Sequence, residues 1–165
     1  MIIGNNTFIH PTALIGENVT IEDECYIGPY CIIGYPAEWK GFETFDKGVY
    51  IGHNTRLTGL VTIDSGVNQI TAIGRNCYFM KGSHVGHDAT VNEGVTVSCG
   101  AKIGGHAIID SFVTIGLNAT IHQKCVIPSG CMIGASSFVG KKSKLKEWFK
   151  YVGVPVRELC PNNPL

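Results

Sequence analysis

Apolar residues occupy every sixth position along most of the chain. The series runs from Ile3 to Ile63, shifts by four residues, and continues from Ile73 to Val139, and all 23 of its positions are apolar. A chain that is 44% hydrophobic would place roughly ten apolar residues at these positions by chance. A glycine often follows the apolar residue, and a small residue usually stands four places after it. This period fits neither an amphipathic helix nor an alternating strand.

A period of six is typical of a parallel β-helix, in which one short strand and one turn use six residues. Three such units form a triangular coil of about 18 residues, and coils stack about 4.8 Å apart. The apolar residue is expected to point inward, the small residue to fit a corner, and glycine to supply the backbone angles of the turns. A single repeat through most of the 165 residues predicts one solenoid of roughly seven coils.

The repeat is interrupted twice and then changes character. Residues 35–48 keep the spacing but are rich in proline and aromatic residues, which predicts a projecting loop, with a degenerate buried coil as the alternative. The shift of four residues predicts a smaller excursion over residues 64–72. After Val139 the apolar residues follow helical spacing, which predicts a short C-terminal helical cap. The expected division is a β-helix over residues 1–140 and a cap over residues 141–165.

Composition narrows the classes of function. The 13 basic and 13 acidic residues balance, which argues against nucleic acid or an anionic membrane as a partner. The N-terminus has neither a basic region nor a long apolar run, so we expect no signal peptide and no membrane span. Five of the seven cysteines occupy the small corner position, and the odd total indicates free thiols in a reducing cytoplasm.

Four of the six histidines flank one predicted column of inward residues. Val85, Ile103 and Ile121 follow one another at intervals of one coil, so they should stack on one face. The histidines beside them fall on outward or corner positions within about 10 Å of one another: His84, His87, His106 and His122. Such a cluster fits general-base catalysis, metal binding or a binding surface without chemistry. His10 and His53 lie outside it and are expected to be structural or surface residues.

The spacing argues against a metal site and leaves two interpretations open, general-base catalysis and a binding surface without chemistry. In the trimeric β-helix carbonic anhydrases two zinc ligands are five residues apart, but Ile127 stands five places after His122 here. We therefore expect no bound metal. For general-base catalysis, His87 is followed by Asp88, which can orient the imidazole ring or stabilise its charged form.

The segments around these histidines resemble the bacterial UDP-N-acetylglucosamine O-acyltransferases, hexapeptide-repeat enzymes that begin lipid A synthesis. The resemblance covers about residues 7–139 and rests on residues 8–13, 27–34, 82–91, 104–106 and 119–123. It implies a left-handed β-helix and a homotrimer with its sites between subunits. It also implies a nucleotide-sugar acceptor and an acyl-thioester donor, acyl carrier protein or coenzyme A, with no bound cofactor.

The same resemblance implies roles for individual residues. His87 matches the general base that deprotonates the sugar 3-hydroxyl, Asp88 its partner, and Gly105 the backbone oxyanion donor. Contacts with the sugar and the acyl chain are implied for His84, His106, His122 and Gln123, and for Glu38 and Lys40 of the projecting loop. Ala135 matches the position that limits acyl length, where alanine predicts a preference for medium chains over the longest.

The chain departs from that family near its C-terminus. It ends at Leu165, where the family continues into a helical domain that helps to bind acyl carrier protein. Its ending, Gly153 to Arg157, looks more like that of sugar acetyltransferases that use coenzyme A. The sequence therefore predicts acyl transfer to the 3-position of a UDP-N-acetylglucosamine-like sugar. It leaves open a coenzyme-A-dependent N-acetyltransferase of amino-sugar nucleotides and a non-catalytic binding protein on the same scaffold.

Overall fold

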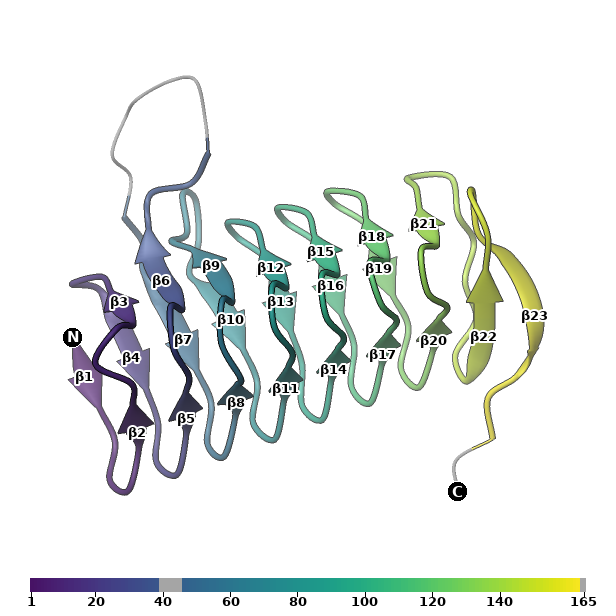
Figure 1. The fold of residues 1–165 in the computed structure, drawn as a ribbon. Coiled ribbons are helices and arrows are strands. Elements are labelled where there is room, and N and C mark those ends of the chain that lie inside the picture. The colour runs from purple at the N-terminus through teal and green to yellow at the C-terminus, as the bar shows by residue number, and fades with distance from the viewer. Residues whose placement is uncertain (39–45, 164–165) are drawn as a thin grey trace.

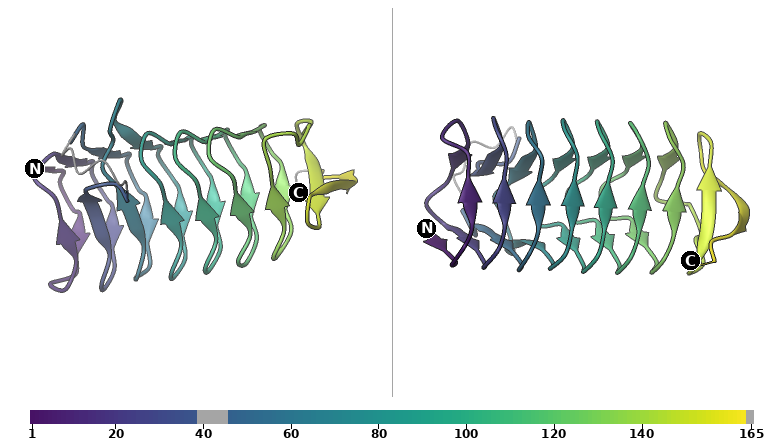
Figure 2. Two further views of the ribbon diagram at one scale, coloured as in Figure 1. Left: turned by 90° about the horizontal axis from the view of Figure 1, so that it is seen from above. Right: turned by 60° about the horizontal axis from the view of Figure 1, so that its bottom comes forward.

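The chain folds into a solenoid of short strands, as the period of six predicts. The computed structural model describes residues 1–38 and 46–163, which contain 23 strands in three sheets. Successive strands pass from one sheet to the next, so that each coil contributes one strand to each face (Figure 1). Figure 2 shows the coils stacked side by side from the N-terminus to the C-terminus.

From β1 to β21 each sheet contains every third strand, and β22 and β23 both join sheet B. Sheet A contains β1 (Ile2–Ile3), β4 (Val19–Ile21), β7 (Val49–Ile51), β10 (Thr71–Ile73), β13 (Thr90–Val91), β16 (Ile108–Ile109) and β19 (Val126–Ile127). Sheet B contains β2 (Phe8–Ile9), β5 (Tyr26–Ile27), β8 (Arg56–Leu57), β11 (Tyr78–Phe79), β14 (Thr96–Val97), β17 (Thr114–Ile115), β20 (Met132–Ile133), β22 (Phe149–Val152) and β23 (Arg157–Pro161). Sheet C contains β3 (Leu14–Ile15), β6 (Ile32–Tyr35), β9 (Thr62–Asp64), β12 (His84–Val85), β15 (Lys102–Ile103), β18 (Thr120–Ile121) and β21 (Phe138–Val139).

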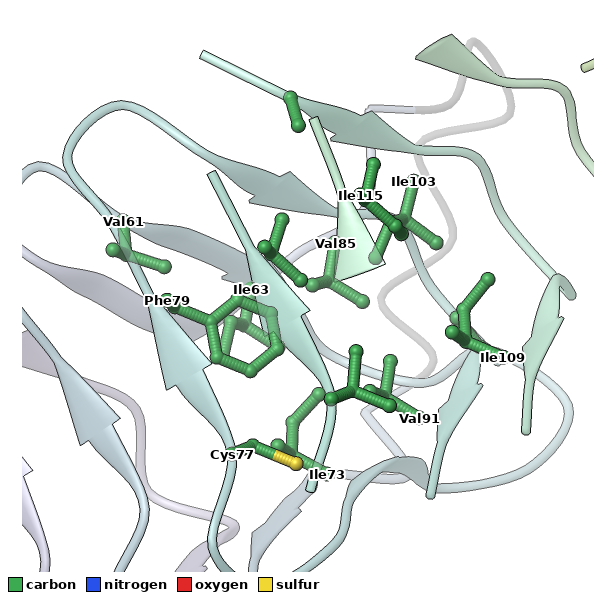
Figure 3. Close-up of a cluster of buried hydrophobic side chains, with 14 of the residues drawn as sticks. Val61, Ile63, Ile73, Cys77, Phe79, Val85, Val91, Ile103, Ile109 and Ile115 are labelled. Carbon is green, nitrogen blue, oxygen red and sulfur yellow. The ribbon is translucent and has the colours of Figure 1, made fainter. Parts of the chain in front are cut away.

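The inward residues of the period-six series form the core. Val85 pairs with Ile103 and Ile103 with Ile121, which confirms the predicted coil of three repeats. These side chains and those of the other faces point into the solenoid, where Phe79, Ile103 and Ile109 are fully buried (Figure 3). Most of the small corner residues are buried too, among them the five cysteines predicted to lie there: Cys25, Cys31, Cys77, Cys125 and Cys131. At the N-terminal end Ile3 is 37% exposed, because no coil covers that side.

Two insertions interrupt the coil frame where the sequence predicts them. Ile21 pairs with Ile51, which lies two repeats further along the chain than a plain coil would place its partner, and the extra residues fall between β6 and β7. The predicted loop over residues 35–48 lies there, and its residues 39–45, with Lys40, are outside the described part. Ile51 pairs with Ile73, so the shift of four positions that marks the second excursion falls between β9 and β10.

The glycines after the inward residues have a different role from the one expected. Apart from Gly34, with a φ of 75°, they do not adopt left-handed angles; instead a Cβ on Gly28 would lie 2.5 Å from the carbonyl oxygen of Thr58 in the next coil. Glycine is therefore needed for close approach between coils. The left-handed angles occur three places after the inward residue, where Asn118 has a φ of 53° and even Leu60 has a φ of 53°. Left-handed backbone costs an ordinary residue about 1–2 kcal/mol, so stacking overrides local preference at these corners.

The predicted C-terminal helical cap is wrong, because the described residues after Val139 form strands. β22 pairs in parallel with β20, with Ile133 opposite Tyr151, and β23 folds back antiparallel to β22. Leu145 and Tyr151 continue the spacing of six, and Tyr151 is only 2% exposed. The chain after Val139 gains backbone hydrogen bonds by pairing with an existing sheet edge, whereas a short isolated helix is only marginally stable. Within residues 1–38 and 46–163, no helix has the length and apolar character that a bilayer crossing requires.

Candidate functional site

The predicted histidine column lies along the corner between sheet C and sheet A. His84 is on β12, and His87 follows that strand at the corner. His106 and His122 occupy the same corner in the next two coils, because β12, β15 and β18 are consecutive neighbours in sheet C. The structure therefore brings these residues to one edge, although they come from three different coils.

Asp88 is the most tightly held side chain at this corner. It is fully buried, and its Oδ1 accepts three backbone N–H bonds, from Val67 at 3.1 Å and from Asn68 and Gln69 at 2.7 Å each. Its other oxygen, Oδ2, accepts a hydrogen bond of 2.7 Å from Nδ1 of His87. Successive backbone N–H groups pointing at one atom form an anion-binding nest. Both oxygens of the Asp88 carboxylate are therefore held by hydrogen bonds.

The second excursion builds this nest. Gln69 belongs to the residues inserted between β9 and β10, and its Nε2 also donates to the backbone carbonyl of Asp88 at 2.9 Å. Thr71, at the start of β10, accepts the N–H of Asp88 on its Oγ1 at 2.9 Å. Asp88 has a φ of 60°, the left-handed angle found at this position of other corners. The sequence revealed four extra residues here, but not that their backbone wraps a carboxylate one coil further on.

The surroundings of Asp88 favour its charged form. Burial raises the pKa of this carboxyl, but the hydrogen bonds from the Gln69 N–H, His87 and the Asn68 N–H, with the nearby charge of His106, together hold the pKa below its ordinary value. An ionised Asp88 can only accept, so Nδ1 of His87 carries the proton and donates it to Oδ2. The opposite nitrogen, Nε2 of His87, is then left with a lone pair that can take a proton.

Gly105 and His106 lie against the His87 ring from the next coil. The rings of His87 and His106 are 5.0 Å apart and nearly perpendicular, and Nε2 of His106 is 3.5 Å from Oδ2 of Asp88. A Cβ on Gly105 would lie 2.9 Å from Nε2 of His87, so only glycine leaves that nitrogen accessible. Within the described residues, the N–H of Gly105 donates to no protein acceptor. A basic nitrogen and an unused backbone donor therefore lie side by side.

His84 faces away from this pair, toward the preceding coil. Its Nδ1 is 2.8 Å from Oγ1 of Thr62, and its Nε2 is 3.8 Å from Oδ2 of Asp64. Burial, and secondly the charge of Lys102, lower the pKa of His84. These groups and Glu38 line a pocket of about 230 Å³ beside the corner. The sequence did not single out Asp64, whose only signal was a charged residue directly after an inward isoleucine.

The remaining predicted site residues are less closely joined to this centre. Nδ1 of His122 lies 3.1 Å from the backbone carbonyl of Gln123, and its ring meets the edge of Phe138. Gln123 is exposed one coil beyond Gly105. Ala135 is exposed on the corner between β20 and β21, a different corner from that of His87 and next to the last strand of sheet C. Within one chain, the acyl-length position therefore does not join the histidine corner.

Three of these groups could geometrically approach one metal ion. Ligand atoms of His87, Asp88 and His106 lie within 4.8 Å of one another. Their hydrogen bonds argue against that use, because Oδ1 of Asp88 already accepts three N–H bonds and Oδ2 accepts the His87 proton. A metal would have to displace these bonds. The absence of a bound metal stays a prediction.

The repeat of six residues and the three parallel sheets define a fold class, the left-handed parallel β-helix. The family model described as bacterial transferase hexapeptide (six repeats) matches residues 1–35 and 71–105. Two solved structures share the fold with TM-scores of 0.91: the UDP-N-acetylglucosamine acyltransferases from Campylobacter jejuni, 28% identical, and Bacteroides fragilis, 25% identical. They are covered over 63% and 70% of their length, and this chain over 97% and 98%.

Curated relatives are similar to this chain in sequence as well. The acyl-[acyl-carrier-protein]–UDP-N-acetylglucosamine O-acyltransferase of Campylobacter concisus is 31% identical over 109 residues, which are 64% of this chain and 42% of that protein. The enzyme of the same name from Thermodesulfovibrio yellowstonii is 42% identical over 69 residues, or 42% of this chain and 20% of that protein. The resemblance expected from the histidine motif is thereby confirmed. The chain spans less than half the length of these curated relatives.

Proposed function

We propose that this protein is an acyltransferase that moves an acyl group from a thioester donor to the 3-hydroxyl of a UDP-N-acetylglucosamine-like sugar. The observation that carries the proposal is the hydrogen-bonded pair of His87 and Asp88 beside the unused N–H of Gly105. A base and an oxyanion donor in one place are what acyl transfer to a hydroxyl requires. The names of the similar proteins supply the substrate class.

His87 acts as the general base in this proposal. Its Nε2 takes the proton of the sugar hydroxyl while that oxygen attacks the carbonyl carbon of the thioester. The imidazole becomes positively charged, and the ionised Asp88, 2.7 Å from Nδ1, stabilises that charge without accepting the proton. The three N–H bonds to Oδ1 keep Asp88 in place during this change.

The N–H of Gly105 stabilises the negative charge that develops on the carbonyl oxygen. A Cβ on Gly86 would lie 2.7 Å from this nitrogen, so glycine at position 86 lets the two coils approach closely at this point. When the tetrahedral intermediate collapses, the carbon–sulfur bond breaks and the leaving thiolate takes the proton from His87. The base is then regenerated, and the products are the acylated sugar and a free thiol.

The partners follow from the same resemblance. We propose acyl carrier protein as the donor, with coenzyme A as the alternative carrier, and a homotrimer in which neighbouring chains complete each site. Apolar side chains exposed on the outer faces of the strands, including Leu14, Ile32, Ile108 and Val126, support association with further copies. Sedimentation or light scattering at micromolar concentration tests this, and a monomer would contradict it.

The test is an acyl-transfer assay that follows the acylated sugar by mass spectrometry. The panel combines acyl-carrier-protein and coenzyme A thioesters with UDP-N-acetylglucosamine and its 3-amino analogue. We expect product from the hydroxyl acceptor, and a rate reduced roughly 10²–10⁴-fold in folded His87→Ala. Transfer only to the amine from coenzyme A would favour the N-acetyltransferase alternative. Binding of the nucleotide sugar with no transfer from any donor would favour a non-catalytic protein.

A further inference from the structure

Two aspartates lie near His87 in opposite surroundings. Asp88 is fully buried and its carboxylate accepts four hydrogen bonds. The side chain of Asp64 is only 16% exposed, yet it accepts no hydrogen bond from the described residues. Buried carboxylates are normally paired or hydrogen-bonded, because removal from water is costly. The Asp64 carboxylate can therefore accept a hydrogen bond from a molecule bound beside it.

A polar atom of a bound molecule can reach Asp64 and His84 at the same time. Oδ2 of Asp64 and Nε2 of His84 are 3.8 Å apart, too far for a direct hydrogen bond. In the tautomer in which Thr62 donates its hydroxyl proton to Nδ1 of His84, 2.8 Å away, Nε2 of that ring carries the proton and acts as a donor. A hydroxyl group can lie within hydrogen-bond distance of both atoms, accept from His84 and donate to Asp64.

The two groups open into the pocket of about 230 Å³ that Tyr35, Pro36 and Glu38 also line. The register places this pocket next to the reacting centre, because Ile63, just before Asp64, pairs with Val85, two residues before His87. The pocket lies on the N-terminal side of His87, whereas Gly105 lies on the C-terminal side, one coil on. A molecule held in the pocket can present a neighbouring group to His87 without covering the N–H of Gly105.

Burial also raises the proton affinity of the Asp64 carboxyl. The pKa of Asp64 is raised from its ordinary value of 3.8 to about 6, mainly by burial, with the charge of His87 lowering it and that of Glu38 raising it. His84 from β12 and Tyr35 from β6 also face it. A ligand that donates a hydrogen bond to Asp64 would offset part of the free-energy cost of burying its charge. Carboxyls whose surroundings push their pKa values apart take different tasks in one site.

We propose that Asp64 is the residue that determines acceptor specificity. Together with His84 it binds one hydroxyl group of the acceptor, adjacent to the group that His87 deprotonates. The identity of the acceptor as a nucleotide sugar rests on the proposed function, whereas the assignment of Asp64 rests on the gap and the pocket. Asp88 then orients the base His87, and Asp64 binds the acceptor.

The experiment compares Asp64→Asn with wild type on the full chain, using UDP-N-acetylglucosamine, its 4-epimer and its 6-deoxy analogue. Loss of a charge-assisted hydrogen bond should raise the acceptor KM about 10- to 100-fold, with kcat and the donor KM changed less than threefold. Wild type should discriminate against at least one of the two analogues, and Asp64→Asn should lose that discrimination. A matched control is Asp110→Asn. Asp110 also directly follows an inward isoleucine, but it accepts from Asn92 at the corner between sheets A and B.

The outcomes separate this inference from the proposed function. If wild type is active and the acceptor KM of Asp64→Asn stays within twofold, the role of Asp64 is overturned while the transferase proposal stands. If wild type transfers nothing, calorimetric titration with UDP-N-acetylglucosamine decides. Weaker binding to Asp64→Asn than to wild type and Asp110→Asn would support the pocket, and equal or absent binding would overturn it.

Discussion

Replacing Asp88 by asparagine should abolish the base without dismantling the corner. The three N–H donors of residues 67–69 require an oxygen at Oδ1, so the asparagine amide nitrogen must take the place of Oδ2. It then points its own hydrogens at Nδ1 of His87, 2.7 Å away in wild type. The ring must accept there, which moves its proton to Nε2 and removes the lone pair that deprotonates the acceptor.

The expected loss of rate follows from the displaced imidazole proton. A wrong imidazole tautomer costs about 10⁴ in kcat in an unrelated hydrolase with a His–Asp pair, so we expect a loss of about 10³–10⁴ here. The free energy of unfolding should fall by about 1–3 kcal/mol, because the hydrogen bonds to Oδ1 remain but lose their charge assistance. Asp88→Ala should destabilise the fold more than Asp88→Asn, because it leaves three buried donors without acceptors.

The assay measures initial transfer rates and urea unfolding for wild type, Asp88→Asn, Asp88→Ala and the control Asp110→Asn. Asp110→Asn should retain both rate and stability. A rate for Asp88→Asn within threefold of wild type, in a folded protein, would refute the tautomer argument. Equal unfolding midpoints for Asp88→Asn and Asp88→Ala would refute the assignment of the nest.

Further outcomes test the rest of the site. Gly105→Ala should reduce kcat at least tenfold with an unchanged melting temperature, because its Cβ meets Nε2 of His87 at 2.9 Å while its backbone angle is ordinary; wild-type kcat would contradict this. The raised pKa of Asp64 means that the folded state binds a proton more tightly than the unfolded state, so stability should fall as pH rises from about 4 to about 6. Asp64→Asn should remove that slope and be about 2 kcal/mol more stable at pH 7, as urea unfolding across pH would measure. Ala135→Gly should shift donor preference to longer acyl chains and Ala135→Met to shorter ones, and unchanged chain-length profiles would remove Ala135 from that role. Activity should survive dialysis against a chelator, and stoichiometric metal in the purified protein would contradict the expectation of no bound metal.

Local sequence was sufficient for the coil and its stacking. The inward positions are a property of spacing alone, because three repeats of six return the chain to the same face, and Val85, Ile103 and Ile121 stack as expected. The same spacing extends to Leu145 and Tyr151, where helical periodicity competed with it and gave the wrong prediction. Two periodicities can coexist in a short segment, and the available strand edge decides between them.

The chemistry of the corner was predictable only in part. The sequence determined that His84, His87, His106 and His122 share one edge, since coil arithmetic converts separation along the chain into position. Tertiary structure alone decided which groups meet. The backbone of residues 67–69 wraps a carboxylate from the following coil, and Asp64 is mostly buried with no hydrogen-bond donor among the described residues. Insertions carry no period, so where their N–H groups point depends on packing between coils and cannot be read from the order of residues.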